Sequence, residues 1–251
     1  MLDKIRMSLN DYRSVSLNEI DAIRLMNRVD TKYIVPMETM IHLLGELTGD
    51  YLVLEIASKR FGQYSTVYYD TPDLQMFYMH VTSRFPRFKL RERTYSQNGI
   101  QFLEVKQKKS NGKTLKKRLP FESDACFDDF VVGHTPFRTE DLHPKLSNRF
   151  YRITLVNREL TERLTLDFDL QFHSFNGFDT PVFNHAAIVE LKQDKKTNSV
   201  IASRLKDKNI RPCGMSKYCV GMLLLNNHLS YKMYKKNFVK FLNHTSWNYS
   251  G

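Results

Sequence analysis

Cysteine is scarce in this sequence, and its pattern excludes two classes of cross-linked protein. The 251 residues contain only three cysteines, Cys126, Cys213 and Cys219, and no two of them form a C-x-x-C pair. A disulfide framework or a structural zinc site needs cysteines that are more numerous or closely paired. The sequence therefore predicts a protein that folds without disulfide bonds or structural zinc, in a reduced, cytoplasmic setting.

Long apolar runs and targeting signals are also missing. The longest aliphatic stretch, residues 220–225, is interrupted by Gly221 and is too short to span a bilayer. The start, Met1 to Arg6, is charged and lacks the apolar core of a signal peptide. The histidines show no metal-ligand spacing, and no repeat or linker divides the chain. We expect a single domain over residues 1–251, with its core at about 20–228 and a basic, aromatic tail from 229.

Positive charge is what the sequence has in excess. Lysine and arginine number 38 against 27 aspartates and glutamates, which gives a formal net charge of +11. Such an excess favours an anionic partner, namely nucleic acid, phosphates or an acidic membrane surface. Charge alone leaves these three classes open.

The placement of the charges is more informative than their number. Side chains on a strand alternate between its two faces, so Lys89, Arg91 and Arg93 in residues 86–96 share one face. Four further segments repeat the pattern, with Arg28, Asp30 and Lys32; Glu104, Lys106 and Lys108; Arg163, Thr165, Asp167 and Asp169; and Glu190 and Lys192. Five such strands predict a sheet with one densely charged, mostly positive face, which suits a polyanion.

The order of strands predicts the fold class. Strands are expected near 28–35, 64–70, 86–96, 100–109, 113–121, 150–159, 162–174 and 186–193, with hairpin turns at Asn98-Gly99 and Asn111-Gly112. Helices are expected at about 16–26, 36–47, 198–207 and 216–228, with a short helix and a polar loop within 123–147 and a possible short helix in the tail. We predict an α+β, mainly β protein: an antiparallel eight-stranded tunnel barrel with peripheral helices. Its charged face would line a lumen that takes one elongated anion.

Six short motifs resemble those of one family. They are Arg28-x-x-x-Lys32-Tyr33, Tyr69-Asp70-Thr71, Lys89-Leu90-Arg91-x-Arg93, Leu103-Glu104-Val105-Lys106, Val189-Glu190-Leu191-Lys192 and Ser216-Lys217-Tyr218. Their order and spacing are similar to those of VTC domains, the polyphosphate-polymerase members of the triphosphate tunnel (CYTH-like) superfamily. The resemblance extends over about residues 20–228.

The resemblance implies an activity and a set of site residues. The activity is transfer of the γ-phosphoryl group of ATP onto inorganic polyphosphate, with Mn²⁺ or Mg²⁺ held by Glu190 and with a membrane-protein partner as a further possibility. The implied catalytic residues are Lys32, Arg91, Arg93, Lys106 and Lys217. The implied phosphate-binding residues are Arg28, Lys89, Lys117, Arg158, Arg163, Lys192 and Ser216, with Lys116 as the alternative to Lys117.

Departures from the family patterns keep alternatives open. Hydrolytic tunnel enzymes begin with Glu-x-Glu-x-Lys, whereas this chain has Arg28 and Asp30 before Lys32. Val156 replaces a family tyrosine, and Gly214 replaces a basic residue. A metal-dependent tunnel triphosphatase and a non-catalytic module that binds polyphosphate or nucleic acid are the alternative functions. The simpler structural alternatives are that Asp167 and Asp169 offset tunnel arginines, that Glu190 pairs with Lys192 or an arginine, and that Ser216 caps a helix.

Overall fold

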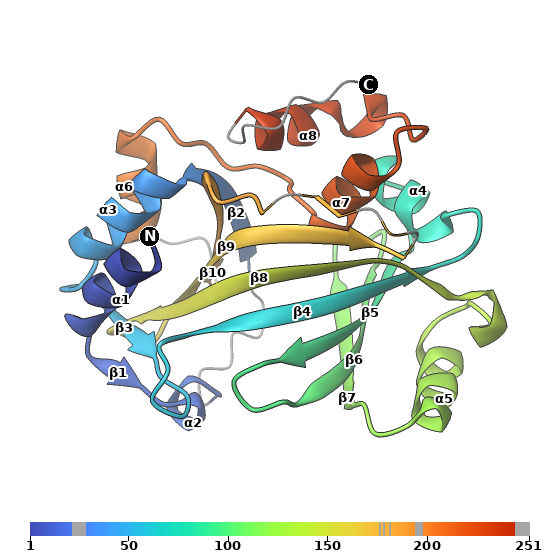
Figure 1. Ribbon diagram of the computed structural model, residues 1–251, viewed down its shortest axis with the longest axis horizontal. Helices are drawn as coiled ribbons and strands as arrows, with labels where there is room; N and C mark the ends of the chain where they lie inside the picture. The colour runs from blue at the N-terminus through green and yellow to red at the C-terminus, as the bar shows by residue number, and fades with distance from the viewer. Residues whose placement is uncertain (22–28, 176, 178, 181, 194–197, 244–251) are drawn as a thin grey trace.

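A curved antiparallel sheet organises the protein, as the computed structural model shows (Figure 1). The structure describes residues 1–21, 29–175, 177, 179–180, 182–193 and 198–243. Within these residues the strand order is β2-β10-β9-β8-β4-β5-β6-β7, and the short strands β1 and β3 join at the side of β8. Every pairing is antiparallel except that of β1 with β3. The main strands are β2 (Val29–Pro36), β4 (Phe61–Asp70), β5 (Arg87–Tyr95), β6 (Gln101–Lys108), β7 (Thr114–Pro120), β8 (His143–Asn157), β9 (Glu162–Ser174) and β10 (Ala186–Gln193).

The expected closed barrel is not what the strand pairing gives. The order ends at β2 on one side and β7 on the other, and these two strands do not pair within the described residues. A segment of chain lies along the free edge of β2 instead, where the backbone N–H of Cys213 donates to the carbonyl of Lys32 at 2.8 Å. The mainly β, antiparallel character is confirmed, whereas closure into an eight-stranded barrel is not found in the strand pairing of the described residues.

Helices cover the sheet in separate groups. They are α1 (Leu2–Asn10), α2 (Leu17–Asp21), α3 (Met37–Glu46), α4 (Gln75–Val81), α5 (Asp124–His134), α6 (Val200–Asp207), α7 (Lys217–Leu225) and α8 (Lys235–Leu242), with 3₁₀ turns at Thr139–Asp141 and Lys232–Tyr234. In Figure 1, α1, α3 and α6 lie together on one side, and α7 and α8 lie above β9. No helix within the described residues is long and apolar enough to cross a membrane.

The sequence predictions hold for most elements and fail where local signals are weak. The capping box is confirmed, because the Ser16 N–H donates to Glu19 at 2.8 Å, but only Leu17–Asp21 of the expected helix 16–26 is described. Strand β8 begins at His143 and not near 150. Four elements were not predicted from the sequence: α1, α4, β1 (Ser14–Val15) and β3 (Tyr51–Leu54).

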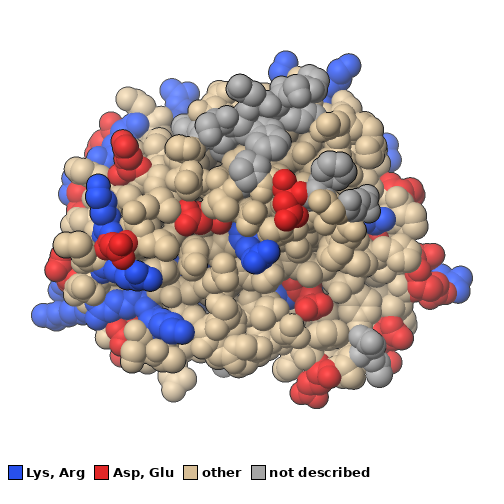
Figure 2. Space-filling model, in the orientation of Figure 1, with Lys and Arg blue, Asp and Glu red and all other residues tan. Residues whose placement is uncertain are grey.

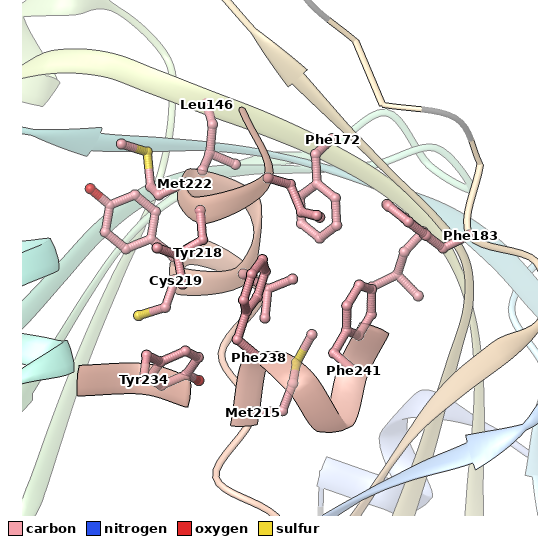
Figure 3. Packing of buried hydrophobic residues seen from close by; sticks show 14 of the residues in the cluster. Leu146, Phe172, Phe183, Met215, Tyr218, Cys219, Met222, Tyr234, Phe238 and Phe241 are labelled. Atoms are coloured by element: carbon pink, nitrogen blue, oxygen red, sulfur yellow. The ribbon is translucent and has the colours of Figure 1, made fainter. Parts of the chain in front are cut away.

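Apolar side chains pack on both faces of the sheet, but in different ways. On the outer face, Leu166 and Val189 pack with residues of α1, α3 and α6, while Leu90 and Val105 pack against α5. On the inner face, α7 and α8 pack onto Leu146 and Phe172, as Figure 3 shows. Close approach of α7 requires Gly221, because a Cβ there would lie 2.5 Å from the Phe172 ring. The inner face is thus apolar at the end where α7 and α8 seal it.

Candidate active site

Charged side chains occupy the rest of the inner face. Residues that lie opposite each other in paired strands point to the same face, so the register identifies this group. Lys32 lies opposite Glu190, and Glu190 lies opposite Thr165. Arg91 lies opposite both Tyr68 and Glu104. By the same registers and contacts, the face also carries Lys89, Arg93, Lys106, Lys116, Arg118, Arg152, Arg163, Asp167 and Lys192.

Charges from distant strands approach one another across this face. Burial and the nearby charges of Lys32, Lys106 and Arg91 together lower the pKa of Lys89 on β5 to about 7. Lys32 belongs to β2, at the far end of the strand order from β6 and β7. Such an influence requires short separations in a partly desolvated space. The contacts of Lys32 with Met215 and of Lys89 with the adjacent Ser216 show that the curvature of the sheet brings cations of its two halves together.

Three carboxylates on this face are each held between two cations, an arrangement that we call a clamp. In the Glu104 clamp, Arg91 Nη2 lies 2.5 Å and Lys116 Nζ lies 2.6 Å from the carboxylate oxygens. Glu104 is 1% exposed. Burial opposes its ionisation, but Arg91, Arg93 and Lys116 outweigh burial and hold its pKa well below the usual range. Glu104 is therefore a fixed anion that positions cations from β5 and β7.

The Asp167 clamp joins β8, β9 and α7. Arg152 donates to both carboxylate oxygens, from Nε at 2.6 Å and from Nη2 at 2.7 Å, and Lys217 forms an ion pair with one of them. Burial lowers the pKa of Lys217 to about 8, although Asp167 opposes the shift. The Nζ of Lys217 also lies 4.2 Å from the centre of the Phe150 ring. The first residue of α7 is thereby fixed over the sheet.

The Glu190 clamp holds two lysines. Lys32 Nζ lies 3.6 Å from one oxygen of Glu190, and Lys192 forms an ion pair with the other. Burial opposes ionisation of Glu190, but these lysines outweigh it and keep its pKa well below the usual range. Burial lowers the pKa of Lys192 to about 8. Pairing of Glu190 with Lys192, the simpler expectation from the sequence, is confirmed.

Between the clamps lie polar groups with spare hydrogen-bonding capacity. Arg93 is 6% exposed and donates from Nε to Thr66 Oγ1 at 3.2 Å, and no ion pair to it occurs within the described residues. Asn148 lies opposite Thr66 in the register. Its amide is buried, and neither amide atom has a hydrogen-bond partner among the described residues. These donors are available to an anion that enters the inner face.

The N-terminus of α7 meets the cations of β5. Ser216 is the N-cap residue, and its Oγ accepts from the backbone N–H of Cys219 at 3.3 Å. Lys89 Nζ donates to the same oxygen at 2.9 Å. Lys32 Nζ reaches the carbonyl of Met215 at 3.4 Å. The expected capping role of Ser216 is confirmed, and the segment that ends in this cap links the edge of the sheet to its centre.

The structure gathers most of the predicted site residues but not all of them. The register places Lys106 opposite Lys116, and Lys117 opposite Val105, so Lys117 points to the outer face and the alternative, Lys116, is the residue of the inner face. Arg158 lies exposed in the turn after β8 and outside the clamps. Arg28 lies outside the described residues. Arg152 was not predicted from the sequence, and it joins the site because the register of β8 and β9 places it opposite Asp167.

The described side chains could hold a divalent metal only if phosphate oxygens of a bound substrate completed its coordination. No group of three or more histidine, cysteine, aspartate or glutamate side chains suited to a metal occurs within the described residues. Glu190 is ionised, however, and Thr165, opposite it in the register, has a buried Oγ1 without a partner among the described residues. Mg²⁺ commonly binds through one or two carboxylates together with phosphate oxygens and waters. The residues fit a metal shared with phosphates.

Phosphate binding is the chemistry that this arrangement suits. Arginine forks bind phosphate oxygens in bidentate fashion, and lysines contribute point charges. The outer surface offers no equivalent on the side seen in Figure 2, where acidic and basic side chains are interspersed and basic ones gather mainly at one edge. The inner face of the sheet therefore carries a denser positive charge than the side of the surface seen in Figure 2.

Solved structures define the class of this fold. The protein HpAC1 from Hippeastrum, assigned as an adenylyl cyclase and described as having a dominant triphosphatase activity, superimposes with a TM-score of 0.50. Its sequence identity is 16%, over 78% of this chain and 95% of that one. An adenylate cyclase candidate from Vibrio parahaemolyticus gives 0.45 at 13% identity, covering 76% and 95% of the two chains. The PH1819 protein from Pyrococcus horikoshii OT3 gives 0.45 at 14%, covering 80% and 99%. The likeness to HpAC1 shows that the two proteins share a fold.

Sequence comparison identifies the family within this class. The model of the VTC domain matches residues 27–132 and 133–226. Because these segments include most of the chain, the protein belongs to the VTC domain family. No curated protein sequence matches it. The resemblance that the sequence motifs indicated is confirmed.

Proposed function

We propose that this VTC domain is an ATP-dependent polyphosphate polymerase, which transfers the γ-phosphoryl group of ATP to a growing inorganic polyphosphate chain. The observation that supports it most is the excess of cations on the inner face, where each of the three clamp carboxylates has two cationic partners. An extended chain of phosphates presents negative charge at regular intervals, and this face can neutralise it along its length.

The residues of the clamps have distinct tasks in this proposal. Arg91 and Arg93 bind the oxygens of the transferring phosphoryl group, while Lys116 and Lys106 neutralise charge on the neighbouring phosphates. Arg152 and Lys217 hold the chain near the start of α7. Phosphoryl transfer depends on such positioning and charge stabilisation more than on a covalent catalyst. Mn²⁺ or Mg²⁺, bound by Glu190 and phosphate oxygens, would neutralise charge between adjacent phosphates.

A tunnel triphosphatase is the second candidate. Asp30 lies opposite Lys192 in the register and adds a carboxylate to the Glu190 region. The Hippeastrum protein of the same fold is described as a triphosphatase. Against this candidate, position 28 is arginine, so the paired glutamates of the hydrolytic motif are absent from the sequence. We therefore favour transfer to phosphate over transfer to water.

One assay separates the candidates. The purified chain is given ATP with Mn²⁺ and then with Mg²⁺, and ADP, free phosphate and gel-resolved polyphosphate are followed together. We expect ADP to appear with a phosphate polymer. Free phosphate without polymer would establish the triphosphatase instead. Binding of polyphosphate without turnover would leave a binding module, and competition by duplex DNA with a steep salt dependence would identify a nucleic-acid module.

Two neighbouring lysines provide a matched test of the site. Lys116 belongs to the Glu104 clamp, whereas Lys117, the next residue, points to the outer face. Lys116→Met should lower turnover by about tenfold, the size of one lost charge contact of roughly 1.4 kcal/mol. Lys117→Met removes the same charge from the same strand and should leave turnover unchanged. Equal effects of the two changes would contradict the assignment of the inner face.

A membrane-protein partner that draws the product away stays a prediction.

A further inference from the structure

Ser216 and Lys89 form a hydroxyl–amine pair inside the proposed phosphate site. Lys89 Nζ lies 2.9 Å from Ser216 Oγ, and the two residues belong to α7 and β5, far apart in the chain. Ser216 is 8% exposed, and Lys89 is half-buried. In other enzymes a serine hydroxyl becomes a nucleophile when an adjacent base can take its proton. The geometry meets the first requirement for such a step.

The surroundings of Lys89 favour its acting as that base. Cations face it from three strands: Lys32 on β2, Arg91 on β5 and Lys106 on β6. The neighbouring groups on helices are Cys219 of α7 and His80 of α4. Burial and these cations lower the pKa of Lys89 to about 7, so a large share of the amine is neutral near neutral pH. Burial also raises the pKa of the Cys219 thiol and keeps the competing nucleophile protonated.

We propose that Ser216 is a covalent acceptor that takes a phosphoryl group from ATP, with Lys89 removing the proton of its hydroxyl. The Oγ–phosphorus bond forms as the bond between the γ-phosphorus and the β,γ-bridging oxygen breaks, and ADP leaves with that electron pair. The proton of the hydroxyl passes to the neutral Lys89 amine. The phosphoserine then lies among Lys32, Lys89 and Arg91, at the N-terminus of α7, where its charge is stabilised. This inference rests on the proposed use of ATP.

The chain contains a matched control for Ser216. Ser199 caps α6 in the same way, since its Oγ accepts from the N–H of Ala202 at 3.4 Å. Its other neighbour is a carboxylate, because Ser199 donates to Glu162 at 3.1 Å. Both Ser216→Ala and Ser199→Ala remove one helix cap, but only the first removes a hydroxyl that faces an amine. A general effect of cap loss would appear in both variants.

The test measures the protein and the products in one reaction. The full chain is incubated with γ-labelled ATP and Mn²⁺, quenched in acid, and analysed for protein-bound label by intact mass and peptide mapping, while ADP and polymer are quantified in parallel. We expect an acid-stable phosphoryl group on Ser216, absent from Ser216→Ala and present in Ser199→Ala. Lys89→Met should slow labelling by about 10²-fold or more, the usual contribution of a general base. Lys89→Arg keeps the charge but accepts no proton and should not restore labelling.

The outcomes separate this inference from the proposed function. ADP and polymer without labelled protein would overturn the covalent acceptor and leave the polymerase standing. Label that persists in Ser216→Ala, or an acid-labile label on the Lys89 amine, would also overturn it. Labelled Ser216 without polymer would support the acceptor and contradict the polymerase. In the parent, labelling should speed up as the pH rises through about 7, and Lys89→Arg should lack that rise.

Discussion

The two faces of one sheet carry opposite chemistry, although they are formed by the same strands. On β9, Leu164 and Leu166 point outward and are fully buried under helices, whereas Thr165 and Asp167 point inward among cations. The period-two alternation of a strand produces this division without any additional element. The outer face supplies the stability that allows the inner face to keep charged side chains crowded together. The protein thus separates folding and function by face and not by region of the sequence.

Breaking the inner face should have the largest effect on activity. Arg91→Ala removes one guanidinium group from the Glu104 clamp, while the charges of Arg93 and Lys116 remain to balance Glu104. We expect turnover to fall by about 10²–10³-fold or more, as when a preorganised donor to a developing charge is lost. ADP release measures the effect, and thermal unfolding reports whether the fold persists. Arg158→Ala, in an exposed turn, is the control. Unchanged activity in Arg91→Ala would refute the tunnel assignment.

Breaking the outer face should destabilise the protein and spare its chemistry. Leu166 is 0% exposed and packs in the cluster beneath α1, α3 and α6. Leu166→Ala should lower the free energy of unfolding by about 2–5 kcal/mol, which denaturant titration measures. Turnover per folded molecule should stay near that of the parent. A large loss of turnover in a variant of unchanged stability would mean that the two faces are not independent in function.

Glu190 sharpens the comparison, because it is an anion on the cationic face. Glu190→Gln removes the charge that holds Lys32 and Lys192. We expect the Mn²⁺ concentration for half-maximal turnover to rise by about tenfold or more, since metal affinity commonly falls by that amount when a supporting group is lost. Binding of polyphosphate without metal should instead tighten, because the two lysines are released. Glu92→Gln, on the outer side of β5, controls for the loss of charge. Parent-like metal dependence in Glu190→Gln would exclude the metal role.

Sequence alone was sufficient wherever a local signal sets the register. The turn at Asn98-Gly99 fixes the β5–β6 hairpin, and the alternation of Lys89, Arg91 and Arg93 could be assigned correctly. A one-residue change of register moves every side chain to the other face. At β7 the register distinguishes two neighbouring lysines. Lys117 was predicted for the site, but the pairing of β6 and β7 places Lys116 on the inner face. The nearby Asn111-Gly112 turn predicts a hairpin but does not specify which lysine faces the sheet interior.

Other parts of the site depend on contacts that no local pattern reports. Arg152 belongs to the site because β8 pairs with β9 and brings it to Asp167. Helix α4 was missed because its N-terminal backbone N–H groups, those of Met76 and Phe77, are satisfied by Asp70 from the preceding strand. Closure of the sheet could not be judged from local patterns, because it depends on β2 and β7 together, which lie far apart in the sequence and do not pair within the described residues.

The smallest expected effect is a change with pH, which tests the folding and binding roles of the same lysines separately. Desolvation lowers the pKa of Lys116, Lys192 and Lys217 to about 8, from the ordinary lysine value of 10.5. Binding of phosphate requires protonated amines, so the affinity for polyphosphate in the absence of metal should fall as the pH rises from 7 to 9. Stability should respond in the opposite direction, because between about 8 and 10.5 the unfolded chain binds more protons at these lysines than the folded chain. Calorimetric titration and thermal unfolding across this range measure both. Affinity and stability that decline together would show that alkaline loss of binding reflects unfolding and not the inner face.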